Sequence, residues 1–370
     1  MVSGARAIEF RGAHARRQHG REVRTMTNAA SSAVAQDIST LRVEILYTGG
    51  TFGMIDHGEG LRPRAGIGGE VADLIDAYSD CYGIPVEFRY TELDRVIDSA
   101  EAEPGTARLI AERVRARIGA TPPDGVIVIH GTDTMAYTGA RMAFELHDIP
   151  VPVVLTGAQI PLGLPASDAG DNLMLALNSI ATQPAPGVFL AFGSALHPAV
   201  RASKRSCDGY DGFTTVRPLT PPPAPVVHPV AADSAETAAP VGLFTVFPGM
   251  DTDLLDAALR IYHGGVVLEC YGAGTMPMSR AAVAAIGKAT ERGTPVVAIT
   301  HCDSGTVDLE RYQPGRALLA AGAIGGGDMT REAALAKLGH LADLGLPADE
   351  LRRWMTTNLL GELADSPAVH

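Results

Sequence analysis

Short runs made up only of apolar residues recur through this chain and are separated by segments with helical spacing. Residues 126–129, 151–155 and 188–192 are such runs, and helical stretches at 137–147 and 172–181 lie between them. A strand that is apolar at every position is typical of a parallel sheet that helices cover on both faces. The pattern therefore predicts an α/β fold built around a parallel sheet.

A proline-rich segment at 218–239 interrupts this alternation and reads as a linker. Strand and helix patterns resume beyond it, and a chain of 370 residues is too long for one ordinary core. Two terminal helices are expected at 330–341 and 349–359, with Thr330 and Asp349 as N-caps. The predicted organisation is a disordered tail at 1–40, a parallel-sheet N-terminal α/β domain at 41–215 with its active site at the strand ends, a linker at 216–240 and a smaller α/β C-terminal domain at 241–370.

The charge of the chain excludes some classes of partner. The formal net charge is −12, and the first 25 residues carry six arginines against two glutamates, a charge of +4. The remaining residues therefore carry about −16, which argues against binding to nucleic acid or to an anionic membrane. We expect residues 1–25 to be either untranslated, with Met26 as the initiator, or a disordered tail.

The four cysteines lie far apart with no C-x-x-C spacing, which indicates reduced thiols rather than a zinc site or a disulfide framework. No apolar run approaches the about 20 residues that a membrane helix needs. The N-terminus also lacks the apolar core of a secretory signal. These features predict a cytoplasmic protein.

Two of the expected strands end in threonine-containing turns. The first leads into Gly49-Gly50-Thr51, and the second, about 80 residues later, into His130-Gly131-Thr132-Asp133-Thr134. Ligands of open parallel sheets bind beyond the carboxyl ends of the strands, so these turns can converge on one crevice. A threonine hydroxyl needs a base and an oxyanion stabiliser to act as a nucleophile. The pair therefore indicates a threonine-nucleophile amidohydrolase.

Other interpretations of the same residues remain open. Gly49-Gly50-Thr51 alone can be a turn that ends in a helix N-cap, and Lys204 can be part of a solvated basic turn. His130 fits a structural hydrogen bond better than the role of a base. The chain holds only three lysines, Lys204, Lys288 and Lys337, so any lysine that takes part in catalysis is one of these.

The segments 47–54 and 130–135 resemble the two signatures of bacterial-type L-asparaginases, nearer to the cytosolic type I branch. The resemblance extends in the same order through 156–161, 201–204, 300–305, 327–330 and 358–363. It covers the chain from about Arg42 to the C-terminus, and so many ordered matches are hard to obtain by chance.

This resemblance implies a role for each matching residue. Thr51 matches the mobile-loop threonine that forms a β-aspartyl-enzyme, and Thr132, Asp133 and Lys204 match a second triad in which the lysine takes up or relays a proton. Asp133 also matches the residue that binds the substrate α-ammonium, and Ser99 the one that holds its α-carboxylate. The implied substrate-binding residues are Gly50, Ser99, Gly131, Thr132, Asp133 and Ala158.

The chain departs from the family pattern at three positions. Leu61 stands where many members have a tyrosine that assists the nucleophile, and Tyr312 is the candidate to supply that hydroxyl. Ala100 stands where relatives often have serine or glutamine, which puts glutamine acceptance in doubt. Glu269 occupies the position of an arginine in an allosteric type I enzyme. We therefore expect weak or absent allostery by asparagine.

The expected function is hydrolysis of L-asparagine to L-aspartate and ammonia, without metal or cofactor, in a homodimer or homotetramer. One alternative is a glutaminase-asparaginase of broader amide specificity. Another is a catalytically inert sensor of asparagine or aspartate, which the leucine at position 61 favours. A tRNA-dependent amidotransferase subunit shares the signatures but needs an additional N-terminal domain, for which the residues before Leu41 leave no room.

Overall fold

The computed structural model describes residues 40–119, 121–182, 185–222, 226–231 and 239–364. The expectations for residues 1–25 and for all but the last residue of the 1–40 tail lie outside this part of the chain. Residues 39–370 cluster as one compact unit, to which the two sheets described below belong.

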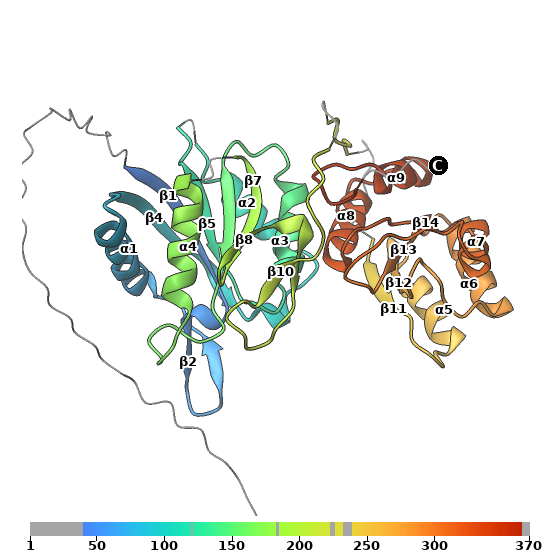
Figure 1. Cartoon of the computed structure of the whole chain (residues 1–370), viewed down its shortest axis with the longest axis horizontal. Coiled ribbons are helices and arrows are strands. Elements are labelled where there is room, and N and C mark those ends of the chain that lie inside the picture. The colour runs from blue at the N-terminus through green and yellow to red at the C-terminus, as the bar shows by residue number, and fades with distance from the viewer. Residues whose placement is uncertain (1–39, 120, 183–184, 223–225, 232–238, 365–370) are drawn as a thin grey trace, which may run out of the picture. The chain divides into compact units, whose positions relative to one another are not determined.

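Six strands form the first sheet, in the order β4-β1-β5-β6-β7-β8 (Figure 1). All neighbouring strands pair in parallel except β8, which turns back antiparallel to β7. The strands are β1 (Leu41–Gly49), β4 (Val86–Ile97), β5 (Gly125–Ile129), β6 (Pro152–Thr156), β7 (Gly187–Phe192) and β8 (Ala195–Pro198).

Helices cover both faces of this sheet because its central strands are apolar on both faces. On β5, Val126 and Val128 belong to one core cluster and Ile127 and Ile129 to another, and all four are fully buried. The first cluster includes residues of α2 (Thr106–Arg115) and α3 (Met135–Glu145). The second includes residues of α1 (Gly68–Tyr82) and α4 (Ala169–Thr182). This is the covered parallel sheet that the apolar runs predict.

A second, four-stranded sheet is parallel throughout, in the order β11-β12-β13-β14. Helices α5, α6 and α7 contribute to the core on one face, and α8 packs on the other. The elements are β11 (Val241–Thr245), α5 (Thr252–Ile261), β12 (Gly265–Cys270), α6 (Arg280–Glu291), β13 (Val296–Thr300), α7 (Gln313–Ala320), β14 (Ile324–Gly325), α8 (Arg331–Asp343) and α9 (Ala348–Met355). The predicted fold class, two parallel-sheet α/β parts, is confirmed, whereas the predicted domain boundaries stay a prediction.

Helix α8 joins the two sheets. It packs against α3, and buried residues of both helices share one core cluster with Val267 and Val297 of the second sheet. The predicted N-cap is confirmed, since the Thr330 side chain accepts a hydrogen bond from the backbone N–H of Ala333 at 3.1 Å. The N-terminal half and the C-terminal half of the chain therefore share a core.

The expectation for the last helix was wrong, and one strand was not predicted. Helix α9 ends at Met355 rather than at 359, and Pro347 rather than Asp349 is its N-cap. The long strand β4 was not predicted at all, because it lies at the sheet edge and only Leu93 in it is buried. A search for fully apolar runs misses such a strand.

None of the helices in the described part of the chain has the length and apolar character to cross a membrane.

The carboxylate of Glu145 on α3 links the halves. Its Oε1 accepts hydrogen bonds from Arg141 Nε at 2.7 Å and lies 3.1 Å from Nδ1 of His340 on α8. Burial raises the pKa of Glu145, but His340 and Arg141 outweigh burial and lower this pKa from 4.5 to about 2. A carboxyl with a lowered pKa in the folded state stabilises the fold above its ordinary pKa.

We therefore expect Glu145→Gln to lower the free energy of unfolding near neutral pH by a few kcal/mol, since each pKa unit corresponds to about 1.4 kcal/mol. The difference from wild type should shrink as the pH falls from 4.5 toward 2. Urea unfolding at several pH values measures this, with Glu112→Gln, an exposed carboxylate on α2, as the control. A difference that does not depend on pH would contradict the assignment.

Candidate active site

Three neighbouring strands of the first sheet deliver the predicted site residues to one edge. Strand β1 runs into the 3-10 turn Thr51–Gly53, β5 is followed by Gly131–Thr132–Asp133, and β6 is followed by Ala158. These strands are parallel neighbours, so their carboxyl ends meet at the same edge. The sheet topology therefore brings the three segments together, as the sequence predicts.

Two glycines bring the first two segments into backbone contact. Gly50 has φ 80°, and a Cβ added to it would lie 2.2 Å from Cα of Gly131. A Cβ on Gly131 would in turn lie 2.3 Å from Oγ of Ser99, whose side chain is buried. No side chain fits at either position, and φ near 80° is strained for other residues. Glycine at both positions therefore brings the Thr51 turn close to Thr132 and Ser99.

Lys204 reaches the same edge from β9 (Ala202–Lys204). Its Nζ donates to Oγ1 of Thr132 at 2.9 Å and to Oδ1 of Asp133 at 2.6 Å. The lysine side chain is 20% exposed and that of Asp133 is 61% exposed, so the pair lies at the protein surface and not in the core. An amine within hydrogen-bond distance of a hydroxyl has the geometry for proton transfer.

Gln159 completes the surroundings of Thr132 and was not among the predicted site residues. The Thr132 hydroxyl donates to Gln159 Oε1 at 3.3 Å, while the amide nitrogen of Gln159 donates to the carbonyl of Ser206 at 3.3 Å. The hydroxyl of Thr132 therefore accepts from Lys204 and donates to Gln159. This arrangement fixes the direction in which its lone pairs point.

Asp168 and Asn172 hold the turn after β6 and were also missed. The Asp168 carboxylate accepts from the backbone N–H groups of Gln159 and Ile160, both at 2.9 Å. The Asn172 amide donates to the carbonyl of Gly157 at 2.9 Å and to Asp168 at 3.0 Å. Both side chains are buried. A carboxylate and an amide four residues apart, just after the 156–161 segment, are the signal that could have found them.

The remaining predicted residues fall into two groups. Ser99 and Ala158 are buried just after the carboxyl ends of β4 and β6. The buried ring of His130 makes a hydrogen bond with the carbonyl of Gly131 at 2.7 Å, and burial lowers its pKa, which fits the structural role expected for it.

The structure does not bring Tyr312 to the cluster. Tyr312 is the N-cap of α7 beside the second sheet, is 48% exposed and has the Arg311 guanidinium over its ring. Within the part of the chain that the structure describes, no hydrogen bond joins it to Thr51 or to Thr132. Leu61, at the position that lacks the tyrosine, is 44% exposed on the short strand β3 (Leu61–Pro63).

Glu269, the residue from which we expect weak or absent allostery by asparagine, forms an ion pair in the structure. Glu269 is buried at the end of β12, where it forms an ion pair with Arg331 at 2.6 Å and accepts from Thr245 at 2.8 Å. Among the described residues, no group of three or more His, Cys, Asp or Glu side chains is arranged to hold a metal ion.

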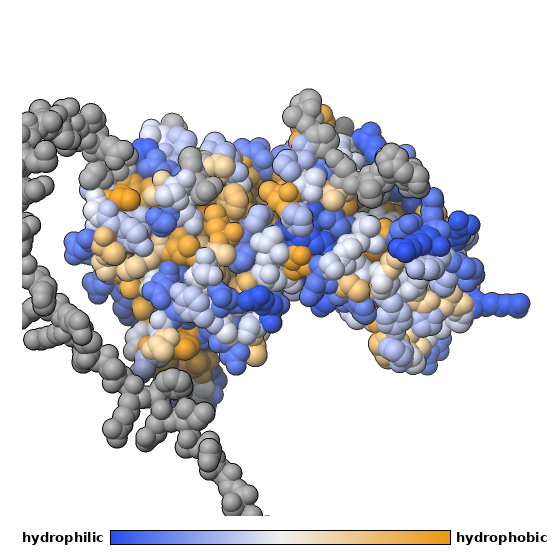
Figure 2. All heavy atoms as spheres, in the orientation of Figure 1, coloured by the Kyte–Doolittle hydropathy of each residue, from blue (hydrophilic) through white to orange (hydrophobic). Residues whose placement is uncertain are grey.

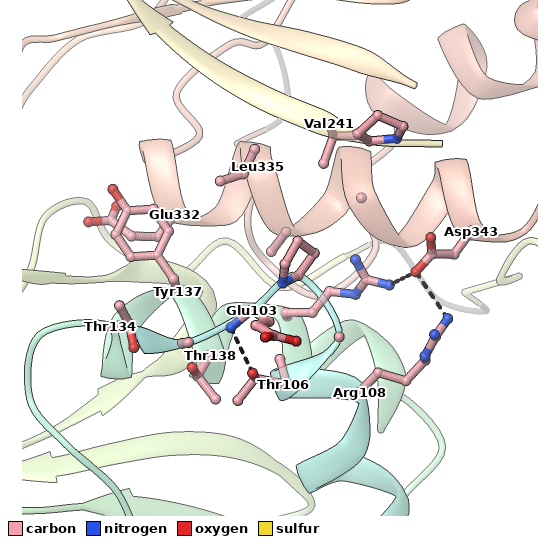
Figure 3. A pocket seen from close by; sticks show the side chains of 18 of the residues that line it. Glu103, Thr106, Arg108, Thr134, Tyr137, Thr138, Val241, Glu332, Leu335 and Asp343 are labelled. Carbon is pink, nitrogen blue, oxygen red and sulfur yellow. Dashed lines mark hydrogen bonds and ion pairs between the residues drawn. The ribbon is translucent and has the colours of Figure 1, made fainter. Parts of the chain in front are cut away.

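A cavity of about 500 Å³ lies apart from this cluster, between α2, α3 and α8 (Figure 3). Tyr137 and Glu332 lie together at one end, and Arg108 and Asp343 lie at the other (Figure 3). Its lining includes Thr134, two residues after Thr132, but none of Thr51, Thr132, Asp133 and Lys204.

Comparison with known proteins supports a family assignment. The family model described as the N-terminal domain of asparaginase matches residues 42–226, and the model of the glutaminase/asparaginase C-terminal domain matches residues 240–355. L-asparaginase 1 of Escherichia coli K12 is 35% identical over 340 residues, which cover 87% of this chain and 97% of that protein.

Two solved structures have the same fold. The thermostable L-asparaginase of Thermococcus kodakarensis superposes with a TM-score of 0.75 at 30% identity, and L-asparaginase I of Vibrio cholerae with 0.74 at 32% identity. Each alignment covers 88% of this chain and all of the other. With both family domains in order and relatives matched over almost their full length, the chain belongs to the asparaginase family of amidohydrolases.

Proposed function

We propose that this protein hydrolyses L-asparagine to L-aspartate and ammonia through an acyl-enzyme on Thr51. The observation that carries the proposal is the contact of Lys204 Nζ with Thr132 Oγ1 at 2.9 Å and with Asp133 at 2.6 Å, next to the Thr51 turn. This cluster supplies a second hydroxyl, an amine and a carboxylate beside the nucleophile, as acyl transfer from an amide requires.

In the first half of the reaction, Thr51 Oγ1 attacks the side-chain amide carbon, and the proton of its hydroxyl is transferred to the amide nitrogen. The backbone at Thr132 and Ala158 meets the amide oxygen and stabilises the negative charge that develops on it. The C–N bond breaks, the nitrogen leaves with this proton as ammonia, and the aspartyl group stays esterified to Thr51.

In the second half, water attacks the ester. Thr132 takes the proton of this water and passes it to Lys204, for which a neutral amine is needed at that moment. Asp133 next to the lysine and Gln159 at the Thr132 hydroxyl keep the three groups aligned. The ester bond breaks, aspartate leaves, and the proton taken up by Lys204 is returned to the oxygen of Thr51.

Substrate is recognised at both ends. Asp133, which is 61% exposed, pairs with the α-ammonium, while Ser99, Gly50 and Gly131 surround the α-carboxylate. The close packing of Ser99 Oγ on Gly131 supports a small, rigid pocket at this end. A short pocket favours asparagine over the longer glutamine.

We place this activity in the cytoplasm, in a homodimer or homotetramer. All four cysteines are free thiols, which suits a reducing compartment. On the face shown in Figure 2, hydrophobic residues gather over the region of α4 and β8. Met174, Leu175 and Leu196 in these elements are only partly buried. Exposed hydrophobic patches mark interaction surfaces, so this face suits contact with another copy of the chain.

Removal of the Thr51 hydroxyl tests the nucleophile. We expect Thr51→Ala and Thr132→Ala each to lower kcat for ammonia release from L-asparagine by at least about a thousandfold, the scale seen when a nucleophile or its base is lost. Thr138→Val, which removes a buried hydroxyl on α3, should stay close to wild type.

The outcomes separate the alternatives. Turnover of L-glutamine at a rate comparable to asparagine would indicate a broader glutaminase-asparaginase. A folded wild-type protein whose thermal stability rises with asparagine but which releases no ammonia from either amide would be a sensor, and the hydrolase proposal would be wrong.

In this proposal, Tyr312 of one subunit acts at the active site of another subunit and not at that of its own. It is half exposed at the N-cap of α7 and makes no hydrogen bond with the cluster of its own chain in the described residues, so its hydroxyl is available to the Thr51 turn of a second chain. In that role Tyr312 of the partner subunit replaces the hydroxyl missing at Leu61.

Mixed oligomers test this role. We expect Tyr312→Phe to lower kcat, and we expect hybrids of Thr51→Ala and Tyr312→Phe chains to regain part of the wild-type activity. A Thr51 from one chain and a Tyr312 from the other then form an intact site. Hybrids no more active than their parents would place both groups in one chain, and a fully active Tyr312→Phe would remove Tyr312 from the site.

A further inference from the structure

The strand that carries Lys204 is held from both of its faces. Strand β9 is only three residues long, and successive side chains of a strand point to opposite sides. Lys204 points to Thr132 and Asp133, whereas Ser203 points to α8, where its Oγ donates to Glu332 Oε1 at 2.7 Å. The residue next to the catalytic lysine is therefore bonded to the C-terminal half of the chain.

Glu332 is an unusual partner for a hydroxyl group. It lies in the first turn of α8, is only 4% exposed and lines the cavity of Figure 3 beside Tyr137. Its Oε2 has no hydrogen-bond partner among the described residues, and burial raises its pKa. Burial of a carboxyl group without full pairing costs free energy, so stability alone does not explain this residue.

A second buried contact holds the start of the strand. The side chain of Arg201, the residue before β9, is fully buried. Its Nε donates to the carbonyl of Gly361 at 2.7 Å, and its Nη1 donates to Asp328 Oδ2 at 3.0 Å. Arg201 is fixed at one end and β9 pairs with residues 213–215, so the bond from Ser203 to Glu332 adds a hold on the face of β9 opposite Lys204. A shift by one residue would turn Lys204 away from the cluster.

We propose that Ser203 and Glu332 are positioning residues, which act on the reaction by holding Lys204 Nζ at Thr132 and Asp133. This inference rests on the proposed function of Lys204. It assigns a catalytic purpose to a contact between α8 and β9, and it makes the rate of proton transfer depend on the C-terminal half. Misplacement of a catalytic group by about 1 Å can cost about a hundredfold in rate.

Kinetic constants for L-asparagine test the proposal. We expect Ser203→Ala to lower kcat by about ten- to a hundredfold with little change in KM, because the lysine is misplaced while the substrate pocket is intact. Ser203→Thr keeps the hydroxyl and should restore kcat. Glu332→Gln keeps a carbonyl acceptor and should retain most activity, whereas Glu332→Ala should resemble Ser203→Ala.

The control is another link between the same helix and the N-terminal half. Asp343 on α8 forms ion pairs with Arg141 and Arg108, and none of these residues contacts β9 through a hydrogen bond in the described residues. Asp343→Asn should lower the melting temperature and leave kcat near that of wild type. The double variant Ser203→Ala/Glu332→Ala should be no slower than either single variant, since both remove one interaction.

A second measurement does not depend on activity. Acetylation by acetic anhydride, read by peptide mass spectrometry, compares Lys204 with exposed Lys288 and fully buried Lys337 in each protein. Relative to Lys288, Lys204 should be acetylated faster in Ser203→Ala than in wild type, because its amine is no longer held between Thr132 and Asp133.

The two possible failures are distinguishable. If Ser203→Ala reduces kcat no more than Asp343→Asn does and leaves Lys204 acetylation unchanged, the positioning proposal is overturned while the proposed hydrolysis stands. If the wild type releases no ammonia but Ser203→Ala still increases Lys204 acetylation, the placement of the lysine is supported and the proposed reaction is wrong.

Discussion

The amine of Lys204, held between the Thr132 hydroxyl and the Asp133 carboxylate, is the contact on which the rest of the site depends. It joins a strand fixed by the C-terminal half to the strand ends of the first sheet. Different parts of the fold position Lys204 and its two partners, Thr132 and Asp133. The order of parallel strands brings the turns after β1, β5 and β6 to one edge, and the shared core of α3 and α8 places β9 against them. The amine of a lysine on an unsupported loop would be positioned less precisely.

The site also requires close contact between the backbone of the Thr51 turn and that of the segment after β5. Gly50 and Gly131 touch at a distance that excludes a side chain, and Ser99 fills the space that remains. The turn after β6 is fixed by Asp168 and Asn172 through hydrogen bonds to its backbone. The candidate site residues Thr51, Thr132 and Ala158 therefore stand on turns that other buried groups support, which is how a site acquires its geometry before substrate arrives.

Much of this could be predicted from the sequence, and the exceptions have physical causes. Fully apolar runs identify strands that are buried on both faces, whereas the edge strand β4 alternates and was missed. Thr132 was predicted as a site residue because it follows such a run, and Thr51 because it follows the β-rich segment that starts at Arg42. Asp168 was missed because its hydrogen bonds to the backbone of Gln159 and Ile160 form only in the fold, and its spacing from Asn172 was the one available signal. Local sequence around Lys204 suggests a solvated turn, and only the family resemblance placed it at the site. Its bonds depend on a strand pairing that no local pattern encodes.

In the proposed reaction, the side-chain amide carbon of asparagine becomes bonded to Thr51 Oγ1. Thr132 and Lys204 then take a proton from the water that hydrolyses this ester. The most direct measurement is peptide mass spectrometry of wild-type protein quenched with acid during turnover of L-asparagine. The account predicts an aspartyl adduct on the peptide that contains Thr51, lost when Thr51 is replaced by alanine. An adduct on the peptide that contains Thr132, or rapid turnover with no adduct on any threonine, would contradict it.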